Sequence, residues 1–270
     1  MDRMLDYDRG KALDVRIIGT RDQGEYLSSD LTFLAREGTR RAASLLKPAG
    51  AGPFPAVLYV HWYEPQACDS NRTQFFEEAC DMARTGVMSL LVETMWSDRE
   101  WFLKRTQEDD LRISVEIVIE LRRAMDLLLQ QPDIDPSRFA YVGHDFGAMY
   151  GVVAGSVDPR PSCYVLMAGT PRFSDWFLYY PSLKGEAREQ FMEKMKPLDP
   201  IERVGSLVPV PILFQFGKDD PHVPVDRGEA FSNAAISPET HWYDAGHGLN
   251  PVARSDRMAW LATKLNVQEG

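Results

Sequence analysis

Three side chains in this sequence have the types and order of a catalytic group: Asp145, Asp220 and His247. Asp145 is the centre of the run Gly143-His144-Asp145-Phe146-Gly147, with a glycine two residues before it and another two residues after it. This spacing is typical of a nucleophile elbow, a sharp turn between a strand and a helix that exposes one side chain at the sheet edge. Glycine is needed at both flanking positions because a Cβ there would crowd the turn. The usual central residue is Ser, and here it is Asp.

The other two residues follow Asp145 in the order acid, then histidine, as they do in triads built on such an elbow. Asp220 comes after the apolar run 211–217, and His247 stands between two glycines after the expected strand 241–244. All three residues should therefore lie just past the C-terminal ends of strands, where open α/β sheets bind ligands. Asp219 remains an alternative to Asp220 as the acid.

An aspartate at the elbow changes the chemistry that the group can do. A carboxyl group with a reference pKa of about 3.9 is ionised at neutral pH, so Asp145 can attack a saturated carbon that bears a leaving group and form a covalent ester. His247 would then deprotonate the water that hydrolyses this ester, while Asp220 orients His247 and stabilises its charged form. Attack on an ester carbonyl would instead give a reactive anhydride, so the residue type argues against a simple carboxylesterase.

Two other interpretations of Asp145 stay open. Asp145 could serve as a base, or stand in place of a native Ser, in an acyl hydrolase. It could also be a helix N-cap in a protein that has lost its nucleophile and binds a ligand without turnover.

The rest of the chain predicts the elements that position these residues. From residue 55 onward, apolar runs typical of buried parallel strands alternate with helical patterns. This alternation predicts an α/β fold with a mostly parallel central sheet and helices on both faces, in a single domain over residues 1–270. Segment 170–210 is a long interruption between strands and predicts a short lid, with an ordinary crossover helix as the alternative. The expected strands are 14–19, 31–34, 41–46, 55–61, 87–92, 138–142, 164–169, 211–217 and 241–244, and the expected helices are 70–84, 108–130, 148–155 and 252–265.

These motifs give the chain a resemblance to the α/β-hydrolase superfamily over roughly residues 30–268. The lead-in 31–48 and the strand 55–61 look like the dienelactone-hydrolase-like branch, whose nucleophile is Ser or Cys. The elbow 143–148 is instead similar to that of haloalkane dehalogenases, haloacetate dehalogenases and epoxide hydrolases, which use Asp. Two features depart from those enzymes. The side chain of Phe146 has no N–H, whereas dehalogenases often have at this position a Trp whose indole N–H can donate. Segment 170–210 is also shorter than their helical cap.

This resemblance implies a cofactor-independent hydrolase that acts on a small molecule, such as a halide or an epoxide, or on an ester in the alternative. An oxyanion hole would be formed by the backbone N–H groups of Phe146 and of Trp62 or Tyr63. Aromatic side chains on the loops around the elbow are expected to line the substrate pocket, although about half of such rings merely cover the core. The candidates are Trp96, Trp176, Tyr179 and Tyr180, together with His61, for which a structural hydrogen bond is the alternative.

Composition sets further bounds on function. The 270 residues carry a formal net charge of −10 and no basic run, which argues against a nucleic-acid partner or an anionic membrane surface. The N-terminus lacks an apolar signal core and no run is long enough to span a bilayer, so the expected location is the cytoplasm. Histidines do not stand at metal-ligand spacing, and no metal or cofactor is expected. Three cysteines, Cys68, Cys80 and Cys163, do not form a disulfide framework. The oligomeric state is left open.

Overall fold

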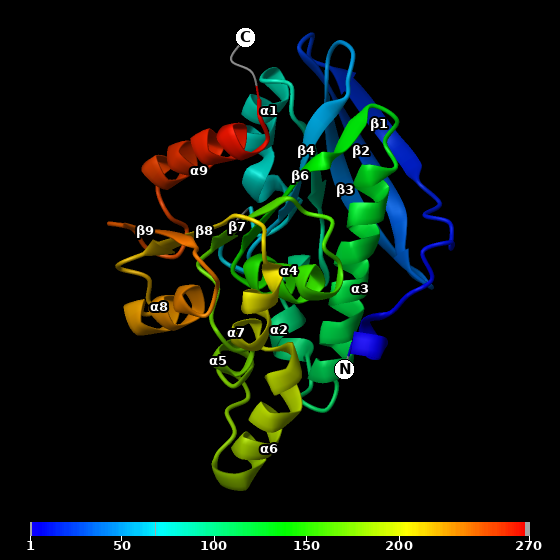
Figure 1. Cartoon of the computed structure of the whole chain (residues 1–270). Helices are drawn as coiled ribbons and strands as arrows, with labels where there is room; N and C mark the ends of the chain where they lie inside the picture. Colours follow the sequence, from blue (N-terminus) through cyan, green and yellow to red (C-terminus); the bar gives the residue numbers. More distant parts are fainter. Residues whose placement is uncertain (1, 68, 268–270) are drawn as a thin grey trace.

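The computed structural model describes residues 2–67 and 69–267, so Cys68 lies outside the described residues. Its centre is a nine-stranded sheet with the order β1-β2-β3-β5-β4-β6-β7-β8-β9 (Figure 1). The first three strands are joined by antiparallel pairing, and β3 also runs antiparallel to β5. From β5 to β9 all neighbours are parallel, which confirms the predicted sheet. The strands are β1 (Arg16–Asp22), β2 (Tyr26–Arg36), β3 (Thr39–Pro48), β4 (Phe54–Val60), β5 (Met88–Val92), β6 (Ile134–His144), β7 (Cys163–Met167), β8 (Ile212–Gly217) and β9 (Glu239–Tyr243).

Burial explains which strands the sequence located well. Every residue of β4, β5, β7 and β8 is buried, so these strands read as continuous apolar runs. In contrast, β1 is exposed along its whole length, and β2 and β3 are only partly buried. The predicted strands 14–19, 31–34 and 41–46 therefore fall on the right elements with the wrong bounds, because strand pairing extends past the apolar residues.

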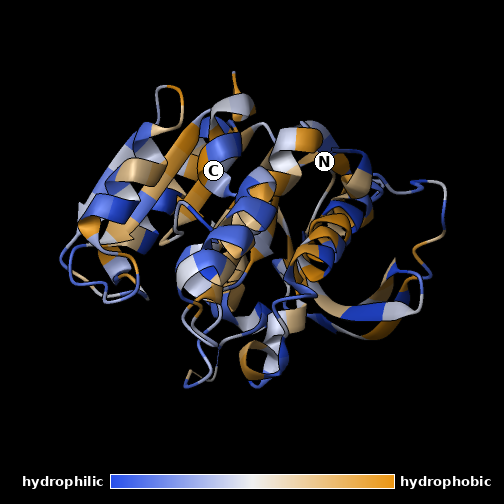
Figure 2. Ribbon diagram, turned by 90° about the horizontal axis from the view of Figure 1, so that it is seen from below, coloured by the Kyte–Doolittle hydropathy of each residue, from blue (hydrophilic) through white to orange (hydrophobic). Residues whose placement is uncertain are grey.

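Helices cover both faces of the sheet, as predicted. On one face, α1 (Phe76–Arg84) and α9 (Pro251–Lys264) pack against strand residues such as Val57 and Tyr59. On the other face, α3 (Asp110–Leu129) and α4 (Phe146–Val157) pack against residues such as Leu58 and Val60, while α8 (Val225–Asn233) packs against Phe214 of β8. Adjacent residues of β4 thus enter opposite cores, which is the two-residue period of a strand. Seen from below, hydrophobic and hydrophilic residues alternate around the covering helices (Figure 2).

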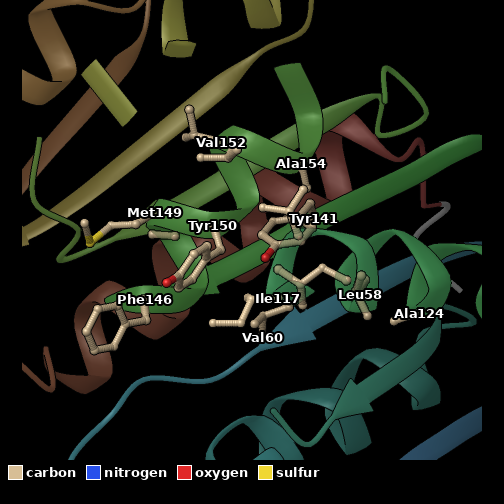
Figure 3. Packing of buried hydrophobic residues seen from close by; sticks show 14 of the residues in the cluster. Leu58, Val60, Ile117, Ala124, Tyr141, Phe146, Met149, Tyr150, Val152 and Ala154 are labelled. Carbon is tan, nitrogen blue, oxygen red and sulfur yellow. The ribbon is translucent and has the colours of Figure 1, made fainter. Parts of the chain in front are cut away.

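The helix after the elbow, α4, is the most enclosed of these. All its residues from Phe146 to Gly155 are buried, and its side chains lie between β6, β4 and α3 (Figure 3). Small residues permit this depth, since a Cβ on Gly151 would collide with the ring of Tyr141. A helix held from all sides gives the elbow at its N-terminus a rigid base.

The segment 170–210 folds into several short helices, and the longest of them, α6, projects from the body of the molecule (Figure 1). The segment is therefore not a single crossover helix, and its role as a lid stays a prediction. The short elements here and elsewhere are α2 (Trp101–Lys104), α5 (Ser174–Phe177), α6 (Gly185–Met195), α7 (Pro200–Arg203), η1 (Asp2–Leu5), η2 (Arg72–Phe75), η3 (Met95–Ser97), η4 (Lys196–Leu198) and η5 (Val204–Leu207). The predicted helix 70–84 is thus divided between η2 and α1.

A buried arginine attaches the lid segment to the body. The Arg105 guanidinium forms an ion pair with Asp110 at 2.5 Å, and both side chains are almost fully buried. It also donates hydrogen bonds to the carbonyl oxygens of Phe177, the last residue of α5, and of Tyr180 in the loop that follows. Burial raises the pKa of Asp110 to about 6, although the charge of Arg105 acts in the opposite direction.

We expect Arg105→Met to lower the free energy of unfolding by about 3 to 5 kcal/mol, because it removes one partner of a buried ion pair. Lys104→Met is the matched control, since Lys104 forms only exposed ion pairs with Asp98 and Glu100 and should cost less than about 1 kcal/mol. Urea unfolding followed by tryptophan fluorescence measures both. Equal losses in the two variants would contradict a role for Arg105 in holding the lid.

Candidate active site

Asp145 occupies a strained turn between β6 and α4. Its backbone has φ 54° and ψ −117°, a region that residues with a side chain rarely adopt, at a typical cost of about 1 to 3 kcal/mol. The turn is tight on both sides: a Cβ on Gly147 would collide with the carbonyl of Val60, and one on Gly143 with the carbonyl of Gly147. The Asp145 N–H donates to the Met167 carbonyl at 2.9 Å. These are the features that the elbow pattern predicts.

His247 and Asp220 form a hydrogen-bonded pair beside this turn. The His247 Nδ1 lies 2.8 Å from Asp220 Oδ2, while Asp220 Oδ1 accepts hydrogen bonds from the N–H groups of His222 and Val223 at 2.8 and 3.1 Å. Asp219, the alternative acid, is exposed and turned away, and its N–H donates to Ala245. Only Asp220 is therefore positioned to orient the imidazole.

The carboxylate of Asp145 lies between the imidazole and a backbone donor. His247 Nε2 is 3.9 Å from Asp145 Oδ2, which is longer than a hydrogen bond. The same oxygen accepts a hydrogen bond from the N–H of Tyr63 at 3.2 Å. Within the described part of the chain, Asp145 Oδ1 and His247 Nε2 are buried atoms without a hydrogen-bond partner. Both atoms therefore keep an unused capacity for hydrogen bonding.

Burial and charge set the protonation of this group. Burial raises the pKa of Asp145 to about 7, against the opposing effects of the His247 charge and of the N–H groups of Tyr63 and Phe146. Burial also acts to lower the pKa of His247, but the hydrogen bond that its Nδ1–H donates to Asp220 and the charges of Asp145 and Asp220 raise it overall. For Asp220, burial is outweighed by the hydrogen bond and charge of His247, so its pKa is lowered. The pair His247–Asp220 is therefore stabilised in its charged form.

The two candidates for the loop side of the oxyanion hole differ in what their N–H groups contact. The Tyr63 N–H points at Asp145, as described above, whereas the Trp62 N–H donates to Gln74 Oε1 at 2.8 Å. The expectation that included Trp62 is therefore wrong, and Trp62 instead stacks its ring on that of His247, with centroids 5.5 Å apart. Gln74 Nε2 also lies 2.6 Å from His144 Nδ1. Sequence patterns contain no signal for Gln74, because it acts through a contact between distant segments.

A cavity of about 210 Å³ lies beside His247 and is lined by Tyr63, Glu64, Pro65, Phe102, Trp176, Tyr179, His222 and His247. Of the predicted pocket residues, Trp176 and Tyr179 reach it from the lid segment. Glu64, Pro65, Phe102 and His222 were not among the predicted pocket residues. Glu64 and Pro65 lie in the loop after β4, next to Tyr63, and His222 stands two residues after Asp220. A larger cavity of about 480 Å³ lies between the N-terminal segment, the β2–β3 turn and α3, and contains none of the three candidate catalytic residues.

Three predicted pocket residues lie elsewhere. His61 is fully buried; its ring contacts the carbonyl of Trp62 at 2.8 Å and the hydroxyl of Thr94 at 2.9 Å, and burial lowers its pKa to about 3. Trp96 is also fully buried and donates to the His61 carbonyl. The side chain of Tyr180 is exposed and does not line the cavity. Their expected role in substrate binding is therefore wrong. His61 and Trp96 belong to the core instead, where their polar atoms form hydrogen bonds.

The described chain offers little for metal or thiol chemistry. Among residues 2–67 and 69–267, no group of three or more His, Cys, Asp or Glu side chains is arranged to hold a metal ion. Cys80 and Cys163 are buried free thiols, and burial raises the pKa of Cys163 to about 12. Among the helices of the described segments, none has the length and apolar character needed to span a membrane.

No family model matches the sequence. Esterase EstD from Thermotoga maritima is 28% identical over 105 residues, which cover 38% of this chain and 24% of EstD, less than two thirds of its length. Among solved structures, an acetyl xylan esterase from Paenibacillus sp. R4 superposes with a TM-score of 0.78 and 16% identity, covering 97% of this chain and 92% of that one. Acetyl xylan esterase 1 from Thermoanaerobacterium sp. JW/SL YS485 gives 0.77 and 15%, with coverage of 99% and 92%. Together with the sheet, these matches establish the α/β-hydrolase fold.

We expect Asp220→Asn to lower the pKa of His247 by about one to three pH units, because it removes the carboxylate that favours the imidazolium. A histidine NMR titration measures this pKa directly. Asp219→Asn removes an equal charge from the neighbouring residue and should leave the titration of His247 almost unchanged. A larger fall of the His247 pKa in Asp219→Asn than in Asp220→Asn would identify Asp219 as the acid.

Proposed function

We propose that this protein is a cofactor-independent hydrolase of a small organic substrate, in which His247 directs water at an ester carbonyl held by the N–H groups of Tyr63 and Phe146. Three observations support this proposal: the strained elbow at Asp145, the hydrogen-bonded pair of His247 and Asp220, and the cavity beside them. The ester can come from two sources: it can be formed on Asp145 during the reaction, or it can belong to the substrate.

The observation that carries the first source is the hydrogen bond from the Tyr63 N–H to Asp145 Oδ2. This donor already holds the carboxylate as it would hold the carbonyl oxygen of an ester on Asp145, and Asp145 Oδ1 is left without a partner in the described structure. A substrate carbonyl would have to displace Oδ2 from the same donor. The geometry therefore favours an ester formed on Asp145, as in dehalogenases and epoxide hydrolases.

In this mechanism Asp145 Oδ1 forms a bond to a saturated carbon while the leaving group departs with the bonding electrons. Water then attacks the Asp145 carbonyl carbon as His247 Nε2 takes its proton. Negative charge develops on Oδ2, where the N–H groups of Tyr63 and Phe146 stabilise it. Collapse breaks the bond between the carbonyl carbon and Oδ1, and the product alcohol leaves with Oδ1 and the proton from His247.

The second source, an ester substrate, is favoured by the comparisons. EstD and both acetyl xylan esterases are named as esterases, whereas the resemblance to Asp-nucleophile enzymes rests on the elbow alone. A pKa of about 7 also suits Asp145 to act as a general base near neutral pH. In this mechanism Asp145 and His247 would activate water for direct attack on the substrate carbonyl.

The two mechanisms differ in where the oxygen of water goes in the first turnover. With enzyme in excess over a haloalkane, styrene oxide or an activated ester in ¹⁸O-water, the Asp145 ester mechanism puts the label in Asp145 and leaves the first product unlabelled. Direct attack puts the label in the product at once. Mass spectrometry of the product and of the Asp145 peptide measures both, with ¹⁶O-water as the control.

We also expect His247→Ala to accumulate an alkyl adduct on Asp145, because water attack on the ester slows by about 10²- to 10⁴-fold without its general base. Intact-protein mass spectrometry and peptide mapping detect the adduct. The matched control is His222→Ala, which removes the neighbouring imidazole of the cavity but leaves the base in place and should not trap the adduct. Turnover of the activated ester alone, with no adduct on Asp145 in any variant, would support the esterase mechanism instead.

The rate of adduct formation in His247→Ala should rise with pH, because only ionised Asp145 can attack. Burial raises the pKa of Asp145 to about 7 in the intact protein, and the charge of His247 acts to lower it. Removing His247 should therefore raise the pKa of Asp145, so the midpoint of the pH–rate curve in His247→Ala should lie above the pKa of Asp145 in the unaltered protein. Single-turnover alkylation followed from about pH 5 to pH 9 measures it. A rate independent of pH over this range would contradict a raised pKa of Asp145.

A further inference from the structure

The cavity beside His247 is bordered by one carboxylate, that of Glu64, which forms no ion pair within the described part of the chain. Its lining contains the carboxylate of Glu64 but neither a lysine nor an arginine among the described residues. Glu64 Oε1 accepts a hydrogen bond from the N–H of Gln66 at 3.1 Å, and no cation of the described chain lies within ion-pair distance of it. Burial lowers the pKa of His222, and the negative charges of Asp220 and Glu64 act in the opposite direction. The negative charge of Glu64 therefore acts on His222, which lines the same cavity.

Aromatic rings form much of the rest of the wall. Tyr63 and Phe102 stack with ring centroids 5.8 Å apart, and Trp176 and Tyr179 lie 6.3 Å apart on the lid segment. The faces of such rings carry partial negative charge and attract cations, most strongly where the cation is desolvated. Rings and carboxylate therefore favour the same kind of ligand.

We propose that the substrate carries an ammonium group, bound between the Glu64 carboxylate and the rings of Tyr63, Phe102, Trp176 and Tyr179, and that Glu64 determines this specificity. The inference rests on the proposed function, since it takes this cavity to be the place where the substrate binds. A volume of about 210 Å³ limits the substrate to a small molecule, below the usual range for ligand pockets of about 300 to 1,000 Å³.

The Glu64 carboxylate also disfavours an anionic substrate. A haloacetate, for example, would bring its carboxylate into a cavity bordered by Glu64, with Asp145 and Asp220 beyond it and His247 as the one counter-charge among the described lining residues. Like charges in a site of low polarity repel strongly. The formal net charge of −10 acts in the same sense over longer distances, because it attracts cations toward the protein.

Binding of choline, compared with its neutral isostere 3,3-dimethylbutan-1-ol, tests the proposal without any turnover. The two probes have the same shape and differ in the charge of one atom. By isothermal titration calorimetry we expect choline to bind about tenfold more tightly, as a cation held by rings and a carboxylate should. The anion 3,3-dimethylbutanoate should bind most weakly of the three.

Glu64→Gln should remove most of the preference for choline and improve the binding of the anion. Glu100→Gln is the matched control: Glu100 is exposed and pairs with Lys104 outside the cavity, so the loss of an equal charge there should change neither ratio. Equal affinities of choline and its isostere for the unaltered protein would overturn the proposal. So would an unchanged ratio in Glu64→Gln, or no binding of choline at all.

Failure of this inference and failure of the proposed function give different results. An adduct trapped on Asp145 by a neutral electrophile would stand even if choline and its isostere bound equally. Conversely, a preference for choline that depends on Glu64 would stand as a binding site even if no adduct formed and no ester were hydrolysed.

Discussion

The strained backbone of Asp145 is the constraint on which the rest of this site depends. A positive φ at a residue with a side chain persists only where the surroundings hold it, and here β6, β4 and α4 approach so closely that Gly143 and Gly147 have no room for a Cβ. The buried helix α4 fixes one side of the turn, and the hydrogen bond to Met167 fixes the other. This packing presents a carboxylate where the fold usually presents a hydroxyl.

Burying that carboxylate has an electrostatic cost, and the neighbouring groups offset it. The N–H of Tyr63 contacts it directly, and His247 lies 3.9 Å away with its own charge supported by Asp220. The balance leaves Asp145 with a pKa of about 7, far above that of an exposed carboxyl group. A carboxylate this poorly solvated is a stronger nucleophile and a better base than one in water, so the same geometry is compatible with both of the proposed mechanisms, the covalent one and the general-base one.

The chain combines the α/β-hydrolase fold that it shares with solved esterases and an elbow residue that is typical of other chemistry. The overall superposition reports on the sheet and its covering helices, because these make up most of the aligned residues. The superposition therefore carries little information about the side chain of Asp145 at the elbow. The lid segment, held to the body by Arg105, supplies two of the rings that border the cavity, those of Trp176 and Tyr179.

The sequence alone determined the α/β fold, the elbow at Asp145 and the partners Asp220 and His247, because buried strands are continuous apolar runs and the glycine spacing reflects a local steric limit. It placed the ends of β1, β2 and β3 poorly, since pairing in a half-exposed sheet extends past the apolar residues. Only the tertiary structure decided that Tyr63 rather than Trp62 donates to Asp145, that His61 and Trp96 belong to the core, and that Glu64, Phe102 and His222 border the cavity. Those outcomes depend on contacts between segments far apart in the chain, and no local pattern of residues records which way a loop side chain turns.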